Sequence, residues 1–291
     1  MIDLHCHSTA SDGTLTPAEL VAAAVASGLQ ALALTDHDTT DGLSDFLAAA
    51  AGKPDFVAIP GIELACQVST GDNCHIVGLF VDSGCDALAV LTAALRQRRN
   101  ERNARMLTKL TDLGLPLQMD DVMSFCGGDV IGRPHFARAL VARGYCRNLR
   151  QAFAKYLGRG RPAYSGREPL PAAECLAVLR KASAVTIWAH PMTSSAMTTA
   201  RCRKVVDELQ ACGLDGIEGY YSDHTQTQTQ TVLAIARENH LLVSGGSDFH
   251  GANMADIALG RGRGDGFLVP ADLLPPLCER ARRAPAEPAL P

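Results

Sequence analysis

The sequence predicts an α/β protein in which about seven βα units close into a barrel that is interrupted by a helical insertion. Short apolar runs rich in β-branched residues alternate with helical patterns along most of the chain, which is typical of parallel strands joined by helical crossovers. The chain has 291 residues, 47% of them apolar, and can therefore bury the core of one large barrel.

The elements of the barrel can be placed in order along the chain. The first strand is expected at residues 2–5. The segment TPAELVAAAVASG then predicts a helix, with Thr16 as N-cap, Pro17 in the first turn, Glu19 as capping-box partner and Gly28 after the last turn. Further strands are expected at residues 31–35, 56–60, 75–81, 185–189, 216–220 and 241–244. Further helices are expected at residues 172–182, 200–211 and 231–239.

The strand signals stop between residues 86 and 167, where only helical patterns remain. One long or broken helix is expected to end at Gly114, and the segments RPHFARALVARG and NLRQAFAKYLG predict two shorter helices. We therefore expect residues 1–85 and 168–291 to form the barrel and residues 86–167 to form a helical cap.

The charge of this insertion differs from that of the rest of the chain. Residues 96–167 hold 15 Lys and Arg against five Asp and Glu, a balance of +10, so the remainder of a chain with net charge −4 carries −14. A basic cap over an acidic barrel favours metal ions in the barrel and an anionic substrate between the two parts. Alternatively, the basic residues of the insertion only form a solvated, arginine-rich helix face.

Composition excludes several classes of function. The net charge of −4 gives no reason to expect binding to a membrane or to long nucleic acid. The ten cysteines include no CxxC pair, and no apolar run approaches the ~20 residues of a membrane span. The N-terminus enters the first strand without a signal-type segment. A cytoplasmic monomer is the expectation.

Histidines and carboxylates gather at the ends of the predicted strands. Six of the nine histidines lie there, and packing alone does not explain so many. The loops after parallel strands converge on one face of a barrel, so these side chains are expected to meet. The candidate metal ligands are His5, His7, Asp12, His37, Glu63, His75, His190, Asp248 and His250.

The spacing and the ligand types indicate a metal centre. His5 and His7 are two residues apart on a strand, so both imidazoles point the same way and can reach one ion. Imidazole with carboxylate suits Mn, Fe or Zn. Nine ligands exceed one coordination sphere, and two or three ions bridged by a carboxylate would suit the hydrolysis of phosphate esters.

The ordered motifs HCHSTASDG, TDHDT, GIE, AHP and SDFH resemble those of the PHP (polymerase and histidinol phosphatase) phosphoesterases through nearly all of the barrel portion. The resemblance implies a distorted (β/α)7 barrel with the metals, Mn above all, at its C-terminal face. One ion would be held by His5, His7, Glu63 and Asp248. Glu63 would bridge to a second ion held by His75 and His190. A third would be held by Asp12, His37 and His250.

Within this family the chain resembles stand-alone bacterial members that carry GRPH in a helical insertion. Such enzymes remove the 3′-phosphate from nucleoside 3′,5′-bisphosphates, and relatives degrade short RNA from its 5′ end. The segment IGRPHFA implies that Arg133 and His135 contact the phosphates. Arg133 stands at a helix start, where free N–H groups favour an anion. Its guanidinium can also donate two parallel hydrogen bonds to one phosphate. The alternative is that RPH merely caps the helix.

Weaker candidates surround this core set. Ser8 and Ser11 could donate to a phosphate or only satisfy the loop backbone. Arg161 and Tyr164 lie on a basic stretch that returns to the barrel and are candidate substrate contacts. His224 could protonate a leaving group, although a lone loop histidine is more often solvated. Two carboxylates, Asp36 and Glu218, could orient metal-bound histidines.

We expect hydrolysis by a metal-bound hydroxide, with His5, His7, Glu63 and Asp248 as the catalytic ligand set. A nucleoside bisphosphate suits the basic insertion because a second phosphate needs its own cations. Short RNA, attacked by a 5′–3′ exoribonuclease, and histidinol phosphate are the alternative substrates. A non-enzymatic alternative is a PHP module that serves a separate polymerase.

Overall fold

The computed structural model describes residues 1–166, 168–194, 196–264 and 267–283. Its main sheet runs in the order β1-β2-β3-β4-β6-β7-β8, with the short β5 paired to β3. The strands are β1 (Ile2–Cys6), β2 (Ala31–Leu34), β3 (Val57–Gln67), β4 (Asn73–Leu79), β5 (Leu170–Pro171), β6 (Val185–Ala189), β7 (Gly216–Tyr221) and β8 (Leu242–Gly246). Backbone hydrogen bonds from Asp248 to His5 and from His7 to Phe249 join the two ends. The sheet is a nearly closed barrel, as predicted.

One strand runs against the predicted direction. We expected parallel strands throughout, but β4 is antiparallel to both β3 and β6. The reason is the connection from β3, because residues 68–72 are too few for the helical crossover that a parallel pair needs. β3 is also longer than predicted, and at Pro60 it exchanges its partner β2 for β4. Glu63 therefore lies within β3, whereas the sequence placed it just after that strand.

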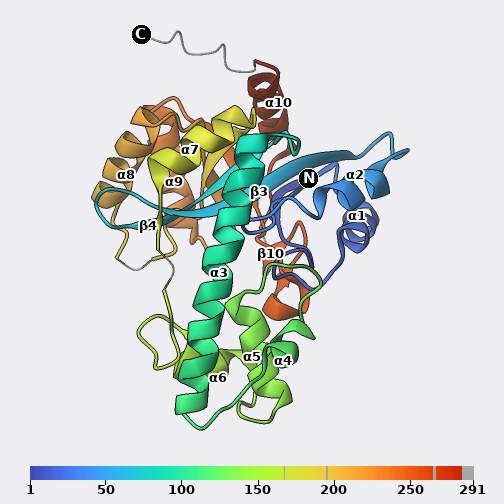
Figure 1. The fold of residues 1–291 in the computed structure, drawn as a ribbon. Helices are drawn as coiled ribbons and strands as arrows, with labels where there is room; N and C mark the ends of the chain where they lie inside the picture. Colours follow the sequence, from blue (N-terminus) through green and yellow to red (C-terminus); the bar gives the residue numbers. More distant parts are fainter. Residues whose placement is uncertain (167, 195, 265–266, 284–291) are drawn as a thin grey trace.

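Helices cover the outside of the barrel (Figure 1). The capping box predicted for Thr16 and Glu19 is present at the first of them. The helix after β2 was not predicted, because its N-cap, Gly42, has no side chain to signal the start. The helices of the barrel are α1 (Pro17–Ala26), α2 (Leu43–Ala50), α7 (Ala172–Lys181), α8 (Thr199–Ala211), α9 (Gln226–Glu238) and α10 (Leu274–Arg282). A small hairpin, β9 (Ile257–Ala258) and β10 (Gly262–Arg263), precedes α10.

Two hydrophobic clusters support the barrel. The inner one includes Ile2, Ile59, Val77 and Val185 and is closed by Leu277 of α10. The outer cluster lies between the sheet and its helices. Because the inner cluster fills the barrel below the mouth, polar side chains at the mouth rest on a packed apolar floor. Among the described residues, no helix has both the length and the apolar composition that crossing a membrane requires.

Residues 86–166, which we call the cap, begin with a helix along the side of the barrel and continue beyond one end of it (Figure 1). The cap contains α3 (Asp86–Asp112), α4 (Met119–Met123), α5 (Arg133–Ala142), α6 (Leu149–Ala152) and a π-helical turn (Phe153–Leu157). Its own apolar cluster includes Met106, Leu110, Phe136 and Leu140. Figure 1 shows α3 running from the α10 end of the barrel along its whole side into the cap.

The buried face of α3 changes character along its length. Leu88, Leu91 and Leu95 pack into the outer barrel cluster, and Met106 and Leu110 pack into the cap cluster. Between them the same face carries the buried residues Arg99, Arg102 and Asn103. The apolar stripe of an amphipathic helix is thus interrupted by two arginines where the barrel meets the cap.

Candidate metal centre

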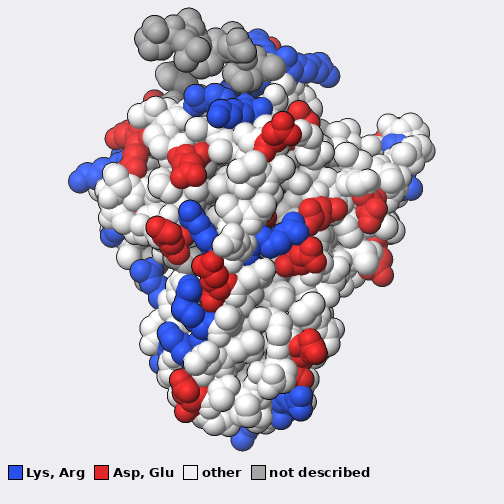
Figure 2. Space-filling view, in the orientation of Figure 1, with Lys and Arg blue, Asp and Glu red and all other residues white. Residues whose placement is uncertain are grey.

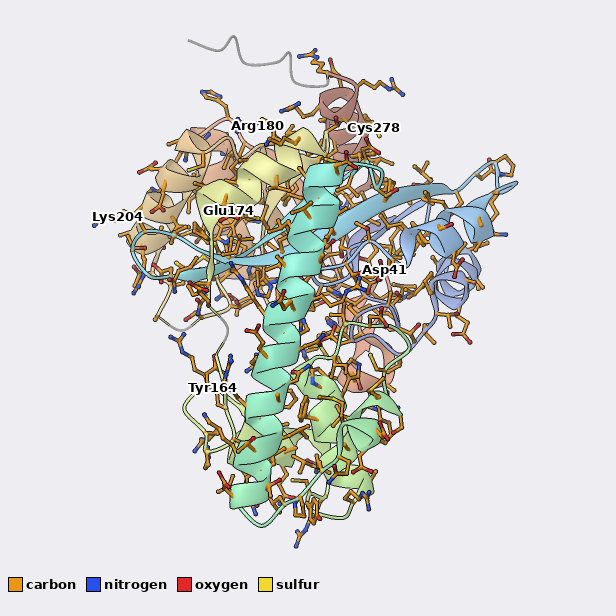
Figure 3. The ribbon with its side chains drawn as sticks, in the orientation of Figure 1. Asp41, Tyr164, Glu174, Arg180, Lys204 and Cys278 are labelled. Carbon is orange, nitrogen blue, oxygen red and sulfur yellow. The ribbon has the colours of Figure 1, made fainter. Side chains whose placement is uncertain are left out.

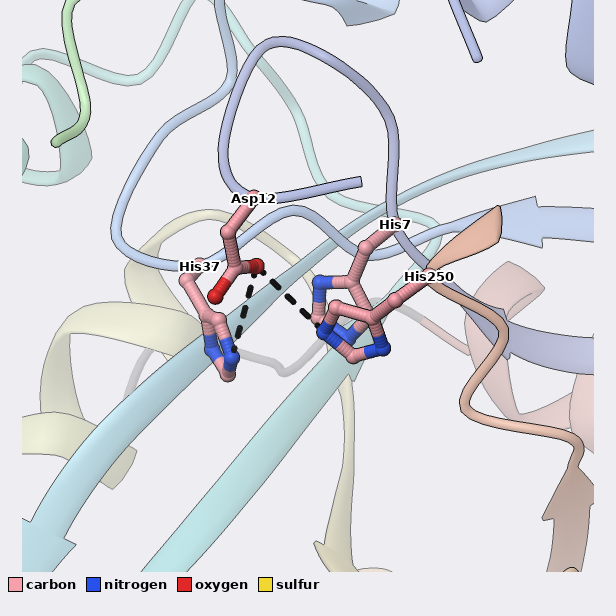
Figure 4. Close-up of side chains that lie close together, drawn as sticks. All are labelled: His7, Asp12, His37 and His250. Atoms are coloured by element: carbon pink, nitrogen blue, oxygen red, sulfur yellow. Dashed lines mark ion pairs between the residues drawn. The ribbon is translucent and has the colours of Figure 1, made fainter. Parts of the chain in front are cut away.

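The nine predicted metal ligands all lie at the barrel mouth, the end of the barrel that faces the cap. Their ligating atoms form four overlapping groups, in each of which the atoms lie within 4.8 Å of one another. One group contains His7, Asp12, His37 and His250 (Figure 4). The other groups are His5, His190 and Asp248; His5, His7 and Glu63; and His37, Glu63 and His75. Because the groups share members, the nine side chains form one continuous cluster.

An irregularity in β1 points His5 and His7 into this cluster. Leu4 belongs to the inner barrel cluster, so strict alternation would turn both histidines to the outside. The register with β2 shifts within residues 3–6, and Cys6 packs into the outer cluster. A β-bulge of this kind resets the alternation of side chains, and both imidazoles therefore face the mouth.

The antiparallel direction of β4 explains the position of His75. This histidine lies near the start of its strand, whereas His7, His37 and His190 follow the ends of theirs. Because β4 runs the opposite way, its first residues reach the same end of the barrel. The ring centroid of His75 lies 5.0 Å from that of His190 and 5.6 Å from that of His37.

Glu63 is the centre of the cluster and is fully buried. Its Oε1 lies 2.7 Å from His75 Nδ1, and its Oε2 lies 2.8 Å from His37 Nδ1. Burial alone would raise the pKa of Glu63, but His37, His75 and other imidazoles outweigh it and hold that pKa well below the ordinary value. The carboxylate is therefore ionised. Imidazoles within 3.5 Å of its oxygens are those of His5, His7, His37, His75 and His190.

Two further carboxylates stand at the edges of the cluster. Asp248 Oδ1 lies 3.1 Å from His7 Nε2, and its Oδ2 accepts a hydrogen bond from Tyr221 at 2.9 Å. Asp12 Oδ1 lies 3.3 Å from His250 Nε2. Burial would lower the pKa of His250, yet Asp248 and Asp12 raise it to about 10, so without a cation at the site this imidazole carries a proton that balances the carboxylates.

The chemistry of the cluster fits divalent metal ions. His5 Nε2, both ring nitrogens of His7 and Glu63 Oε2 are buried and make no well-aligned hydrogen bond, although charged groups lie within 3.5 Å of most of them. Burial lowers the pKa of His7 to about 3, so its imidazole is neutral and a lone pair is available. Burying polar nitrogen and oxygen atoms without hydrogen bonds costs folding free energy unless a ligand binds them. Neutral imidazoles and carboxylates together are the ligands of Mn, Fe and Zn.

Buried carboxylates outside the cluster hold its members in place. His5 Nδ1 lies 3.0 Å from Glu218 Oε1, which fixes Nε2 as the free nitrogen, and Glu218 Oε2 accepts the His190 N–H at 2.7 Å. Glu218 therefore orients a histidine as proposed from the sequence. Asp36 acts differently, because it accepts hydrogen bonds from Ser8 and Ser11 and so fixes the loop that carries Asp12.

Backbone strain also gathers at this site. Asp38, His190 and Asp248 have φ values of 58°, 34° and 56°, in the left-handed region that side chains other than glycine rarely adopt. Each lies in the cluster or next to one of its residues. Such conformations cost about 1–3 kcal/mol and persist where the surrounding structure enforces them, commonly at functional sites.

A cavity of about 330 Å³ separates this cluster from the cap. Asp12, His37 and His75 line its barrel side. The cap contributes arginines and two aromatic rings, and Figure 3 shows Tyr164 on the segment that returns from the cap beside α3. The cap residues that line the cavity include Arg98, Arg99, Arg102, Arg133, Phe153 and Tyr164. The cavity thus has a wall of potential metal ligands and a wall of guanidinium groups.

Comparisons with known proteins agree with this geometry. Residues 3–157 match the model of the PHP domain. The chain belongs to the PHP family. It is 38% identical over 248 residues to a Haemophilus influenzae protein named 5′-3′ exoribonuclease, covering 85% of this chain and 89% of that one. It is 35% identical over 279 residues to a Chromobacterium violaceum 3′,5′-nucleoside bisphosphate phosphatase, covering 95% of this chain and 93% of that one.

A solved structure has the same fold. A candidate metal-dependent phosphoesterase from Bifidobacterium adolescentis superposes with a TM-score of 0.84 and 31% identity, covering 96% of this chain and 95% of that one. This PHP protein is therefore an enzyme, a metal-dependent phosphoesterase. The resemblance read from its motifs is confirmed.

The residues predicted to contact substrate are spread more widely. Arg133 and Tyr164 line the cavity, and the Arg133 guanidinium lies 5.5 Å from the centre of the Tyr164 ring. His135 is buried, and its Nδ1 accepts the Gly132 N–H at 2.9 Å, which is the capping role considered as the alternative. Arg161 is exposed, and neither it nor His135 is among the described residues that line the cavity.

The two other candidates also have roles within the fold. The Ser8 hydroxyl donates to Asp36, so it satisfies its own loop. His224 Nδ1 lies 3.4 Å from the Gly219 carbonyl, and burial lowers the pKa of this imidazole. Neither residue is among those described as lining the cavity.

Sequence reasoning missed the arginines of α3 as individual residues. Arg98, Arg99 and Arg102 line the cavity, but only the total charge of the insertion was considered in the sequence. A specific signal is present, because Arg99 and Arg102 continue the stripe of Leu88, Leu91 and Leu95 on one helix face. Arginine at such positions is buried unless the helix ends, and buried arginine needs an anionic partner.

Proposed function

We propose that this PHP phosphoesterase removes the 3′-phosphate from nucleoside 3′,5′-bisphosphates, with adenosine 3′,5′-bisphosphate giving AMP and phosphate. The observation that carries the proposal is the two-walled cavity. One phosphate ester would lie against the metal ligands, and the second phosphate would lie against the arginines of the cap. A volume of about 330 Å³ is at the small end of ligand sites, which suits a single nucleotide.

Each wall would have a defined task. Divalent ions, when bound, would lower the pKa of a water and neutralise charge that develops on the phosphoryl oxygens. The nine histidine and carboxylate residues would hold these ions, and Glu218 keeps His5 Nε2 turned toward them. Arg133 would position the substrate by donating to its second phosphate, and Tyr164 offers a ring on which a base can stack.

Short RNA is the second candidate substrate. The Haemophilus influenzae relative, at 38% identity, is named a 5′-3′ exoribonuclease. An RNA 5′ end presents the same phosphates as a nucleoside bisphosphate. Histidinol phosphate fits less well, because its amine would face the guanidinium groups of the cap.

A phosphate-release assay on manganese-loaded protein tests the proposal. Adenosine 3′,5′-bisphosphate, AMP, histidinol phosphate and a short 5′-phosphorylated RNA are compared at equal concentrations. We expect the bisphosphate to be hydrolysed fastest and AMP to accumulate. RNA degradation at an equal or higher rate would instead identify this chain as an exoribonuclease.

Two sets of variants test the metal-ligand wall and the arginine wall of the cavity independently. His5→Ala and Asp248→Ala should each lose bound metal and nearly all turnover, and normal activity at full metal content would contradict the ligand assignment.

Arg133→Gln should raise KM for the bisphosphate more than for AMP. Arg138→Gln is the matched control, since Arg138 lies over the Phe125 ring and is not among the described cavity residues.

A further inference from the structure

Two cysteines face each other across the β3–β4 ribbon. Cys66 and Cys74 are direct partners in the antiparallel register, and their sulfur atoms lie 3.2 Å apart as free thiols. Opposed residues in such a pair have Cα atoms about 4.5–5.5 Å apart. A disulfide requires Cα separations of about 4.4–6.8 Å. The backbone is therefore already placed for a bond, and the sulfurs need to approach by only about 1 Å.

Cys66 and Cys74 are nearly buried but lie beside the cavity. Both cysteines are nearly buried, at 4% and 5% exposure, in the cluster between the sheet and α7. Both residues are also among those that line the cavity, so a small oxidant that enters it comes close to the ribbon that carries them. Contact with Cys175 and burial raise the pKa of the Cys66 thiol, and contact with Cys66 and burial raise the pKa of the Cys74 thiol, which slows their oxidation.

The same ribbon carries two of the proposed metal ligands. Glu63 lies three residues before Cys66, and His75 directly follows Cys74. Glu63 Oε1 and His75 Nδ1 are 2.7 Å apart. Alternation turns these side chains to the opposite face of the ribbon from the sulfurs. Although the Cα separation is already in the range of a disulfide, closing the remaining gap between the sulfurs changes the twist of the ribbon and would shift His75, the residue after Cys74, relative to Glu63.

We propose that Cys66 and Cys74 are a modification site, at which a peroxide produces a cross-strand disulfide that reversibly lowers hydrolytic activity. One thiol attacks the peroxide oxygen to give a sulfenic acid and water. The second thiol then attacks that sulfur, the S–S bond forms, and the sulfenic oxygen leaves with the thiol proton as a second water. Hydrogen peroxide takes up the two electrons that the sulfurs lose.

Digestion of the protein with a protease that cleaves before aspartate makes the Cys66–Cys74 disulfide directly measurable. Asp72 lies between the cysteines, so a protease that cuts before aspartate yields the peptides 55–71 and 72–81 with one cysteine each. After hydrogen peroxide treatment of the manganese-loaded protein, mass spectrometry should find these peptides linked and dithiothreitol should release them. Unlinked cysteine sulfinic acids, or a link from Cys66 to the neighbouring Cys175, would overturn the proposal.

Cysteine variants test whether the Cys66–Cys74 disulfide is what lowers phosphate release. The link should be absent from Cys66→Ala and Cys74→Ala and present in Cys212→Ala, whose cysteine lies at the end of α8. Phosphate release should fall by about tenfold to 100-fold in wild type, recover with dithiothreitol, and stay unchanged in both link-free variants. A complete link without loss of activity would overturn the regulatory claim.

The activity measurement rests on the proposed function, whereas the mass measurement does not. If the reduced enzyme releases no phosphate from the bisphosphate, the substrate assignment fails and the disulfide is judged by the linked peptides alone.

Discussion

Glu218 shows how one side chain can organise several others at this site. Its two oxygens bind the ring of His5 and the backbone of His190, which belong to strands on different sides of the barrel mouth. A metal-bound histidine needs such a partner because the partner selects the nitrogen that faces the ion. The sequence suggested that Glu218 could orient a histidine, but it could not say which one, since nothing local connects Glu218 to His5, 213 residues away.

Replacement of this carboxylate tests its role. Glu218→Gln keeps the size of the side chain but removes the charge that makes His5 Nε2 a good donor. We expect manganese affinity, measured by competition with a chelator, to fall about 10–100-fold. Glu174→Gln, on the outer surface of α7 (Figure 3), is the control and should bind manganese normally. Equal affinities in the two variants would contradict the positioning role.

His135 makes a second prediction at the residue scale. Burial lowers its pKa to about 4, whereas the unfolded chain protonates histidine near pH 6.5. Between these pH values the unfolded state binds the additional proton, so stability decreases as pH falls. The expected contribution is about 3 kcal/mol. Urea unfolding at pH 7 and pH 4.5 should show a smaller decrease for His135→Gln than for wild type, and an equal decrease would refute the prediction.

At the scale of elements, the mouth depends on the close approach of β8 to β1. A Cβ atom on Gly246 would lie 2.3 Å from His5 Cβ and 2.5 Å from the His5 backbone nitrogen. Only glycine allows the barrel to close beside the bulge that directs His5 inward. The position of the metal ligands therefore depends on a residue that binds nothing itself.

Gly246→Ala should consequently affect both stability and the metal. The clash is with backbone and cannot be relieved by moving a flexible side chain, so we expect a loss of about 3 kcal/mol or more in urea unfolding, together with weaker manganese binding. Gly166→Ala is the control, because its nearest atom would lie at 3.9 Å, an ordinary contact. Wild-type stability of the Gly246 variant would show that the strands can separate without cost.

Local signals predicted most elements and failed where long-range pairing decided the structure. The capping box of α1 was readable because Thr16 and Glu19 satisfy backbone groups within one turn. The direction of β4 was not recognised because Pro60 and Gly61 resemble the end of a strand, whereas β3 continues through them and changes partners there. The gathering of the nine candidate ligands was predicted nevertheless, since polar side chains at strand ends are visible whichever way a strand runs.

At the scale of the whole molecule, an ion pair joins the cap to the metal centre. Arg99 of α3 is paired with Asp38, directly after the candidate ligand His37, and both side chains are buried. Figure 2 shows other Lys and Arg side chains of the cap along its surface, mixed with isolated Asp and Glu. The basic residues of the insertion thus include buried arginines that contact the barrel as well as exposed ones, and the net charge alone does not separate the two groups.

Removal of the buried arginine should loosen this connection. Arg99→Met removes the contact between this guanidinium and the buried Asp38 carboxylate, and a hydrogen bond to a charged group contributes about 1.5–3 kcal/mol. We expect lower stability in urea and faster proteolysis within the cap. Arg143→Met, which breaks an exposed pair with Asp121, should change little. Equal effects of the two substitutions would show that Arg99 does not fasten the cap.

The long helix α3 finally sets the length scale of the substrate site. Because β4 delivers the chain to the far end of the barrel, one continuous helix of 27 residues, about 40 Å long, must span the barrel before the cap can form. The helix therefore fixes how far Arg98, Arg99 and Arg102 stand from its first turns, which pack on the barrel. An insertion or deletion of one helical turn before these arginines would move them by about 5.4 Å along the helix axis. The length of α3 thus decides where its guanidinium groups stand relative to the barrel mouth.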